Sequence, residues 1–164
     1  MSLAMHPDAI KMSKSMYDSF DDYIDYLNKH RKRFPAAVYD FASDVNRHNL
    51  NSPHSLHDSW MTSITIKENR NPKRPFNPKP TIEIVLLGQM HDRDLILTYE
   101  NVQSYLIEGI KNSFNWKDTF QGDVMCHEVT LDESGHIAHE ILFASESKIT
   151  IVCESFMCQE NMHE

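Results

Sequence analysis

Apolar residues recur every three or four positions in the first third of the chain, with polar residues between them. The pattern runs in two stretches that meet at Phe34-Pro35. This spacing places apolar side chains on one face of a helix. Proline suits the start of the second stretch, because the first turn of a helix needs no backbone N–H there. The pattern therefore predicts a helical hairpin over 8–48.

After His57 the period of the pattern changes to two, which is typical of strands. The predicted strands cover 60–66, 81–87, 95–99, 123–131, 137–143 and 149–156. Residues 132–135 join two of them in a turn that places a glycine where positive φ is needed. Residues 102–114 have instead the spacing of a short helix. We expect 57–156 to form a mostly antiparallel sheet.

The stretch 70–80 interrupts this pattern, because it contains four prolines and four basic residues. Proline fixes φ and removes a backbone donor, so we expect an exposed, extended loop. Helices followed by strands are typical of an α+β fold. The 164 residues suit one domain, 1–164, with two N-terminal helices packed on a sheet of about six strands.

The charge of the chain narrows the classes of partner. Sixteen Lys and Arg stand against 24 Asp and Glu, which gives a formal net charge of −8 and disfavours nucleic acid as a partner. Three cysteines without paired spacing suit a reducing compartment. No apolar run approaches the roughly 20 residues that span a bilayer, and no signal peptide is recognisable. We expect a cytoplasmic protein without a membrane partner.

The negative charge is concentrated in the C-terminal third, where residues 111–164 have a net charge of −7. If Asp132 lies opposite His136, the register places Glu128 directly opposite Glu140 and Glu154 diagonally beyond. Like charges across a strand pair are unfavourable unless something offsets them. The three glutamates therefore form a candidate binding face for a basic protein partner. General acid and base catalysis by the paired carboxylates and a plain solvated surface are the alternatives.

The same register places His127 and His139 on the opposite, apolar face of the sheet. Pairing of Phe143 with Ile149 would bring Cys153 opposite His139. Two imidazoles and a thiol are ligands for Zn²⁺, with an open fourth position for catalysis. Hydrogen bonding of these histidines to the backbone is the alternative, and it leaves no cofactor.

The segment that opens the first predicted strand holds a further pair, His57 and Asp58. A histidine beside an aspartate could serve as an oriented base or as an additional metal ligand. No Gly-x-Ser-x-Gly motif surrounds either neighbouring serine, Ser55 or Ser59. A structural role for Asp58 in the local turn is the alternative.

Several of these motifs together resemble a known group of proteins. They are Leu56-His57-Asp58 at the opening of a strand, Gly122-Asp123, and the pairs His127-Glu128 and His139-Glu140 in one hairpin. The pattern over 56–156 resembles small uncharacterised bacterial proteins, some of them immunity proteins of polymorphic toxin systems. The resemblance implies a cytoplasmic α+β protein that acts by binding and has no catalytic residues. The Pro-rich stretch 70–80 departs from it.

The sequence thus favours a bacterial, non-enzymatic and immunity-like binding protein. Its expected interface is the acidic face of Glu128, Glu140 and Glu154. The alternative is a metal-dependent hydrolase, with zinc as its cofactor, built from His57, Asp58, His127, His139 and Cys153. A homodimer through strand edges or an apolar sheet face stays open as well.

Overall fold

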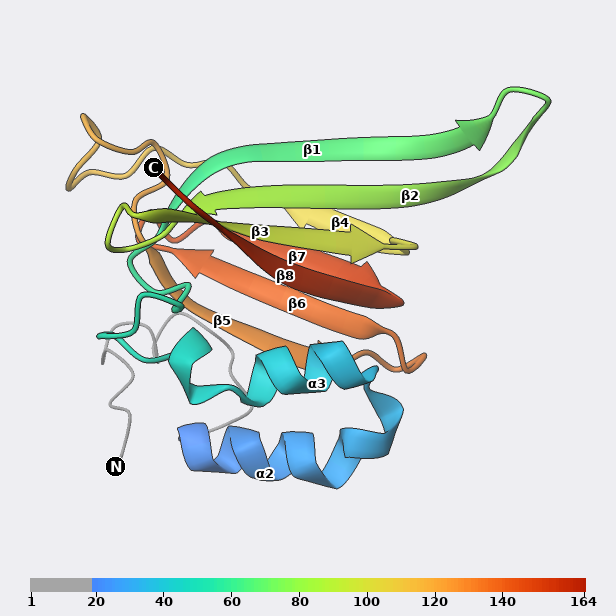
Figure 1. Cartoon of the computed structure of the whole chain (residues 1–164), viewed down its shortest axis with the longest axis horizontal. Coiled ribbons are helices and arrows are strands. Elements are labelled where there is room, and N and C mark those ends of the chain that lie inside the picture. The colour runs from blue at the N-terminus through green and yellow to red at the C-terminus, as the bar shows by residue number, and fades with distance from the viewer. Residues whose placement is uncertain (1–18) are drawn as a thin grey trace.

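The computed structural model describes residues 19–164, which form two α-helices and eight strands (Figure 1). The helices are α2 (Phe20–His30) and α3 (Ala36–Ser43), each followed by a single 3₁₀ turn, η1 (Arg31–Arg33) and η2 (Val45–Arg47). The strands are β1 (Trp60–Asn71), β2 (Arg74–Leu87), β3 (Arg93–Glu100), β4 (Ser104–Ile107), β5 (Val124–Leu131), β6 (Ile137–Phe143), β7 (Lys148–Cys153) and β8 (Ser155–Met162). The predicted α+β class is confirmed. The part of the predicted helical hairpin before residue 19 lies outside the described residues.

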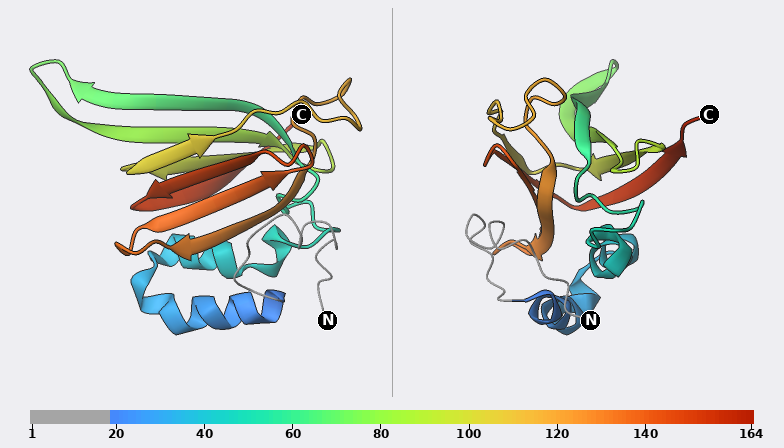
Figure 2. Two further views of the ribbon diagram at one scale, coloured as in Figure 1. Left: turned by 180° about the vertical axis from the view of Figure 1, so that it is seen from behind. Right: turned by 90° about the vertical axis from the view of Figure 1, so that its left-hand side faces the viewer.

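The strands form two antiparallel sheets rather than one. The first sheet has the order β1-β2-β3-β8 and the second the order β4-β7-β6-β5. Their apolar faces meet in one core, to which both helices contribute (Figure 2). The central buried side chains of the two sheets are Ile82, Ile84, Leu86, Leu95, Leu97, Val129, Ile141, Ile149 and Ile151.

The two helices cover the side of the molecule where β5 and β8 form the sheet edges (Figure 1). The hydroxyl of Tyr23 accepts a hydrogen bond from the Val129 N–H at 2.8 Å and donates to the Val129 carbonyl at 2.9 Å. Tyr26 accepts a third bond, from the Leu131 N–H. Helix α3 packs against β8. The backbone groups at the free edge of β5 therefore find partners in α2.

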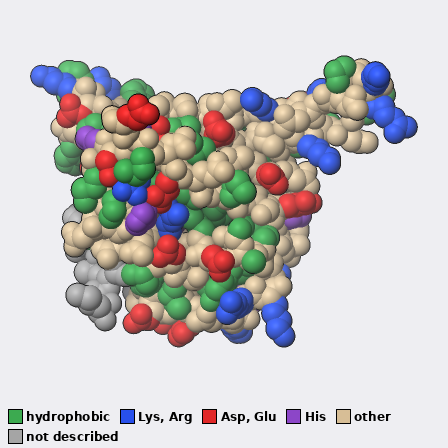
Figure 3. Space-filling view, in the orientation of Figure 1, with side chains coloured by type: hydrophobic (Ala, Val, Ile, Leu, Met, Phe, Trp, Pro, Cys, Tyr) green, Lys and Arg blue, Asp and Glu red, His purple; other side chains and the backbone are tan. Residues whose placement is uncertain are grey.

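The stretch 70–80 is extended and exposed, as predicted, but it is not a loop. This stretch forms the end of a long β1–β2 hairpin that projects from the body of the molecule (Figure 1). Strand β3 pairs with β2 only from Thr81 onward, so the proline-rich half of β2 has a neighbour on one side only. Proline is tolerated at such an edge, where its missing N–H faces solvent. Lys and Arg side chains gather at the tip (Figure 3).

Two further segments differ from the sequence prediction. Residues 102–114 contain the short strand β4 and a loop instead of a helix, because β7 supplies hydrogen-bonding partners for the backbone there. The predicted strand 149–156 bends at Glu154, and the chain then enters the first sheet as β8. The C-terminal residues are therefore part of the fold. Among residues 19–164, no helix combines the length and apolar character needed to cross a bilayer.

Candidate functional site

The β5–β6 hairpin has the register predicted from its turn. The Asp132 N–H donates to the His136 carbonyl at 2.9 Å, and Gly135 has a φ of 82°. Only glycine adopts this conformation without strain, so the turn fixes the pairing of both strands. As a result Glu128 lies directly opposite Glu140.

Both glutamates lie on the outer face of the second sheet and are half-buried. The Lys148 ammonium lies 3.7 Å from a carboxylate oxygen of Glu140. Burial, followed by the charges of Glu128 and Glu140, raises the pKa of the neighbouring Cys126 thiol to about 11. The local potential on this face is therefore negative, and Lys148 offsets part of it.

Glu154 lies farther from this pair than the sequence predicts. Ile149 pairs with Ile141 rather than with Phe143, because Phe143 closes the turn by donating its N–H to the Ser147 carbonyl. The shift of two residues moves Glu154 along the strand into the exposed bend between β7 and β8. Glu154 thus extends the acidic region but is not a diagonal neighbour of Glu140.

The acidic region includes the turns as well as the strands. Residues 123–154 contain seven Asp and Glu and one Lys. We use the name acidic face for the outer side of β5 and β6 together with the β7–β8 bend, which carries Glu128, Glu140 and Glu154.

The inner face of the same two strands carries a chain of hydrogen-bonded rings. His127 Nε2 lies 3.1 Å from the Arg47 carbonyl, and His127 Nδ1 lies 3.1 Å from His139 Nε2. His139 Nδ1 lies 2.7 Å from the Tyr99 hydroxyl. A carbonyl only accepts, so His127 Nε2 donates to it; His139 Nε2 then donates to His127 and Tyr99 donates to His139. The interpretation of these histidines as hydrogen-bonded core residues fits this geometry.

The surroundings of these hydrogen-bonded rings keep the histidines neutral. Burial lowers the pKa of His127 well below 6.5 and that of His139 to about 3. The ring of His48 stacks on His127 with centroids 4.3 Å apart, and burial lowers the pKa of His48 to about 4. Both ring nitrogens of His127 and His139 have partners within the protein.

The structure does not bring the predicted metal ligands together. Cys153 is buried opposite Ile137 instead of His139, which corrects the predicted register of β7. His57 and Asp58 lie in the loop before β1, where His57 Nδ1 is 3.1 Å from a carboxylate oxygen of Asp58. Asp58 has a positive φ of 59°. No group of three or more potential metal ligands occurs within the described range 19–164.

A cluster of ionic groups that the sequence analysis missed ties β8 to the loop before β1. Glu160 accepts hydrogen bonds from Arg47 at 2.7 Å, from Arg93 at 2.9 Å and from His54 at 2.9 Å. Burial works to raise the pKa of Glu160, but the bonds from His54 and Arg93 and the charge of Arg47 outweigh it and lower the pKa. In the sequence, the signal that predicts β8 is the alternation of Phe156, Cys158 and Glu160 with the more exposed residues between them.

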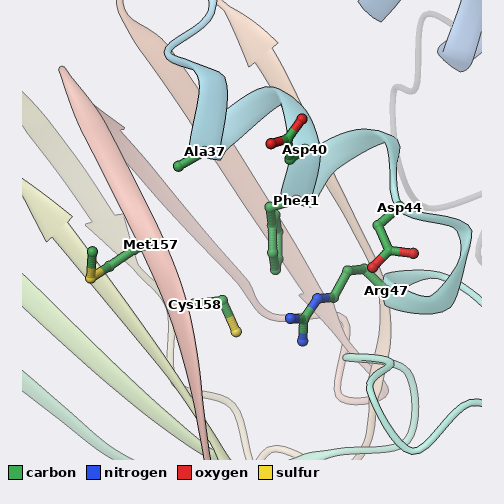
Figure 4. Close-up of a pocket in the computed structure, with 7 residues that line it drawn as sticks. All are labelled: Ala37, Asp40, Phe41, Asp44, Arg47, Met157 and Cys158. Carbon is green, nitrogen blue, oxygen red and sulfur yellow. The ribbon is translucent and has the colours of Figure 1, made fainter.

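A pocket of about 260 Å³ lies between α3 and β8. Figure 4 shows the Phe41 ring and the Arg47 guanidinium extending between the two elements, with Asp40 and Asp44 on α3 and just after it. The Arg47 guanidinium carbon lies 5.4 Å from the centre of the Phe41 ring. Small-molecule sites usually exceed about 300 Å³, and Glu160 already holds this arginine. The acidic face is the stronger candidate for function.

Family models, curated proteins and solved structures were all compared with the chain, and none of them matches.

Proposed function

We propose that the protein is a non-enzymatic, immunity-like binding protein of the bacterial cytoplasm. In this proposal it binds a basic protein partner through the acidic face and needs no cofactor, nucleic acid or membrane. The observation that carries the proposal is the direct pairing of Glu128 with Glu140 on an accessible face of the second sheet.

The pairing concentrates negative charge on this face. Like charges opposite each other are unfavourable in a strand pair, and the Lys148 ammonium lies 3.7 Å from a carboxylate oxygen of Glu140. A partner that supplies Lys or Arg side chains would offset the repulsion when it binds. Complementary charge of this kind also accelerates association and excludes partners of the wrong sign.

The rest of the hairpin is suited to holding the glutamates in place. The inner face of β5 and β6 is fixed by the His127–His139 chain and by the tyrosines of α2. A rigid sheet presents charged groups without losing much conformational entropy on binding, which favours affinity. Residues 19–164 hold no group of three or more potential zinc ligands, so their geometry does not favour the zinc hydrolase.

The proposal is tested with two baits of equal net charge. The first is the triple variant Glu128→Lys, Glu140→Lys and Glu154→Lys. The second changes three exposed acidic residues elsewhere, Asp25→Lys, Glu68→Lys and Glu83→Lys. Partners captured by the wild-type protein are identified by mass spectrometry. Dissociation constants for the main partner are then measured over a range of salt concentrations.

We expect a partner of basic isoelectric point whose affinity falls at least about tenfold, or about 1.4 kcal/mol, with the first variant. The salt dependence of its affinity should decrease at the same time. The control variant should retain most of its affinity. Equal losses for both variants, or an acidic main partner, would contradict the proposal.

A further inference from the structure

Exposed apolar side chains are concentrated in one stretch of the chain. Thirteen large hydrophobic side chains are exposed within residues 19–164, and six of them belong to 105–120. These six are Tyr105, Leu106, Ile110, Phe114, Trp116 and Phe120. The first two belong to β4, an edge strand of the second sheet. Clustered apolar exposure of this kind is typical of a binding surface.

The other three sheet edges are protected. The tyrosines of α2 bond to the edge of β5, and α3 packs against β8. Strand β1 carries charged side chains in its second half, at Lys67, Glu68 and Arg70, and contains two register shifts, one of them in its first half. Charges, irregularities and covering helices are the usual means by which proteins prevent strand pairing between molecules.

Among residues 19–164, strand β4 has none of these features. Its sequence is Ser-Tyr-Leu-Ile, without a charged side chain. Tyr105 points to one face of the sheet and Leu106 to the other, and their side chains are 50% and 59% exposed. An edge that is apolar on both faces is suited to being covered by another strand.

The direction of the free backbone groups follows from the pairing of β4 with β7. The Glu108 N–H donates to the Lys148 carbonyl at 3.0 Å, and Leu106 lies opposite Thr150. Backbone groups alternate in direction along an antiparallel strand, so Leu106 also faces β7. The N–H and carbonyl groups of Tyr105 and Ile107 therefore point away from the sheet.

We propose that β4 pairs antiparallel with β4 of a second copy of the chain, around a two-fold axis at Leu106. Tyr105 then lies opposite Ile107 of the second copy, and the two such pairs share four backbone hydrogen bonds. Leu106 lies opposite the Leu106 of the second copy. The two four-stranded sheets become one sheet of eight strands.

Charge and side-chain chemistry favour a second copy as the occupant. A two-fold axis brings a patch against itself, and this patch is apolar on both faces. The only charged residue next to the strand, Glu108, lies opposite Ser104 of the second copy, so no like charges face each other. The glutamates of the acidic face lie on β5 and β6, with β7 between them and β4. The dimer therefore leaves the acidic face accessible and does not depend on its function.

The first test is the mass of the protein in solution, measured by sedimentation equilibrium across the micromolar range. The wild-type protein should form a dimer of about 38 kDa, which is twice the chain mass of 19.1 kDa. Leu106→Lys should weaken the dimer at least tenfold, whereas Thr65→Lys on the exposed edge of β1 should not. Circular dichroism of Leu106→Lys should show an unchanged fold. A wild-type monomer, or dissociation by Thr65→Lys alone, would overturn the proposal.

The second test is specific for the register. Residues opposite each other in a non-hydrogen-bonded antiparallel pair have Cα atoms about 4.5 Å apart, which a disulfide can bridge. In a background without Cys126 and Cys158, Leu106→Cys should form a covalent dimer on mild oxidation. Tyr105→Cys is the matched control and should react more slowly, because Tyr105 faces Ile107. Equal rates for the two variants would overturn the two-fold axis at Leu106.

Discussion

The two faces of the β5–β6 hairpin carry the same dipeptide in different environments. His127 and Glu128 are neighbours on β5, and His139 and Glu140 are neighbours on β6. Both histidines are buried and neutral and are bonded to each other, while both glutamates face outward. Strand alternation alone separates these side chains by the thickness of one sheet.

The same His-Glu dipeptide thus contributes its histidine to stability on the inner face and leaves its glutamate available for recognition on the outer face. A buried polar group contributes to stability only when all its hydrogen bonds are made. A charged group at the surface contributes little to stability and is free to attract a partner. The histidines and the glutamates should therefore respond very differently to pH and to substitution.

The largest expected effect is a loss of stability in weak acid. Burial lowers the pKa of His48 to about 4 and that of His139 to about 3, whereas an unfolded histidine has a pKa near 6.5. As the pH falls below about 6.5, the unfolded chain takes up protons that the folded protein does not. The free energy of unfolding, measured by urea titration, should fall by up to about 1.4 kcal/mol per pH unit for each histidine.

Substitution separates this effect from the general titration of carboxylates. His48→Gln should reduce the slope of stability against pH by about one proton between pH 6.5 and 5. Thr65→Gln, at an exposed position without a titratable group, should leave the slope unchanged. If the free energy of unfolding of the wild-type protein stayed constant between pH 6.5 and 5, the conclusion that the buried histidines are neutral would be contradicted.

The next effect is the loss of one ring from the inner face. His139→Ala removes the partner of both the Tyr99 hydroxyl and His127 Nδ1 and leaves a cavity. We expect the free energy of unfolding at neutral pH to fall by about 3 kcal/mol. A fall below about 1 kcal/mol would mean that the chain of rings contributes no more than a surface contact.

The smallest effect on stability should come from the outer face, one residue along the chain. Glu140→Gln loses the contact with Lys148 and also the repulsion from Glu128. The free energy of unfolding should change by less than about 0.5 kcal/mol in the same urea titration. A larger loss would show that this carboxylate is structural, and it would weaken the case for the acidic face as a binding surface.

Local chemistry explains why parts of the site could be predicted. Gly135 and Asp132 fix the turn, and the turn alone sets the pairing of Glu128 with Glu140. The predicted pairing across the turn between β6 and β7 was wrong by two residues, because Phe143 could either extend β6 or close the turn. Both choices keep the Phe143 side chain on the same face of the sheet. The error of two residues left every face correct and moved only Cys153 and Glu154.

Longer-range contacts explain the remaining differences. The prolines of 70–80 are compatible with a strand only because β3 ends before it reaches them. The residues of 70–80 do not by themselves indicate where a neighbouring strand ends. Strand β4 depends in the same way on β7, and the bonds that Arg47 in η2 and Arg93 in β3 donate to Glu160 join positions more than 60 residues apart.

The sequence by itself determined the fold class, the β5–β6 register and the separation of histidines from glutamates. Each of these follows from interactions between residues close together in the chain. Only the tertiary structure decided that the strands divide into two sheets, that the histidines form one chain with Tyr99 and the Arg47 carbonyl, and that β4 forms an edge of the second sheet. These features depend on which distant segments meet. That is decided by burial of apolar surface and pairing of buried polar groups over the whole molecule.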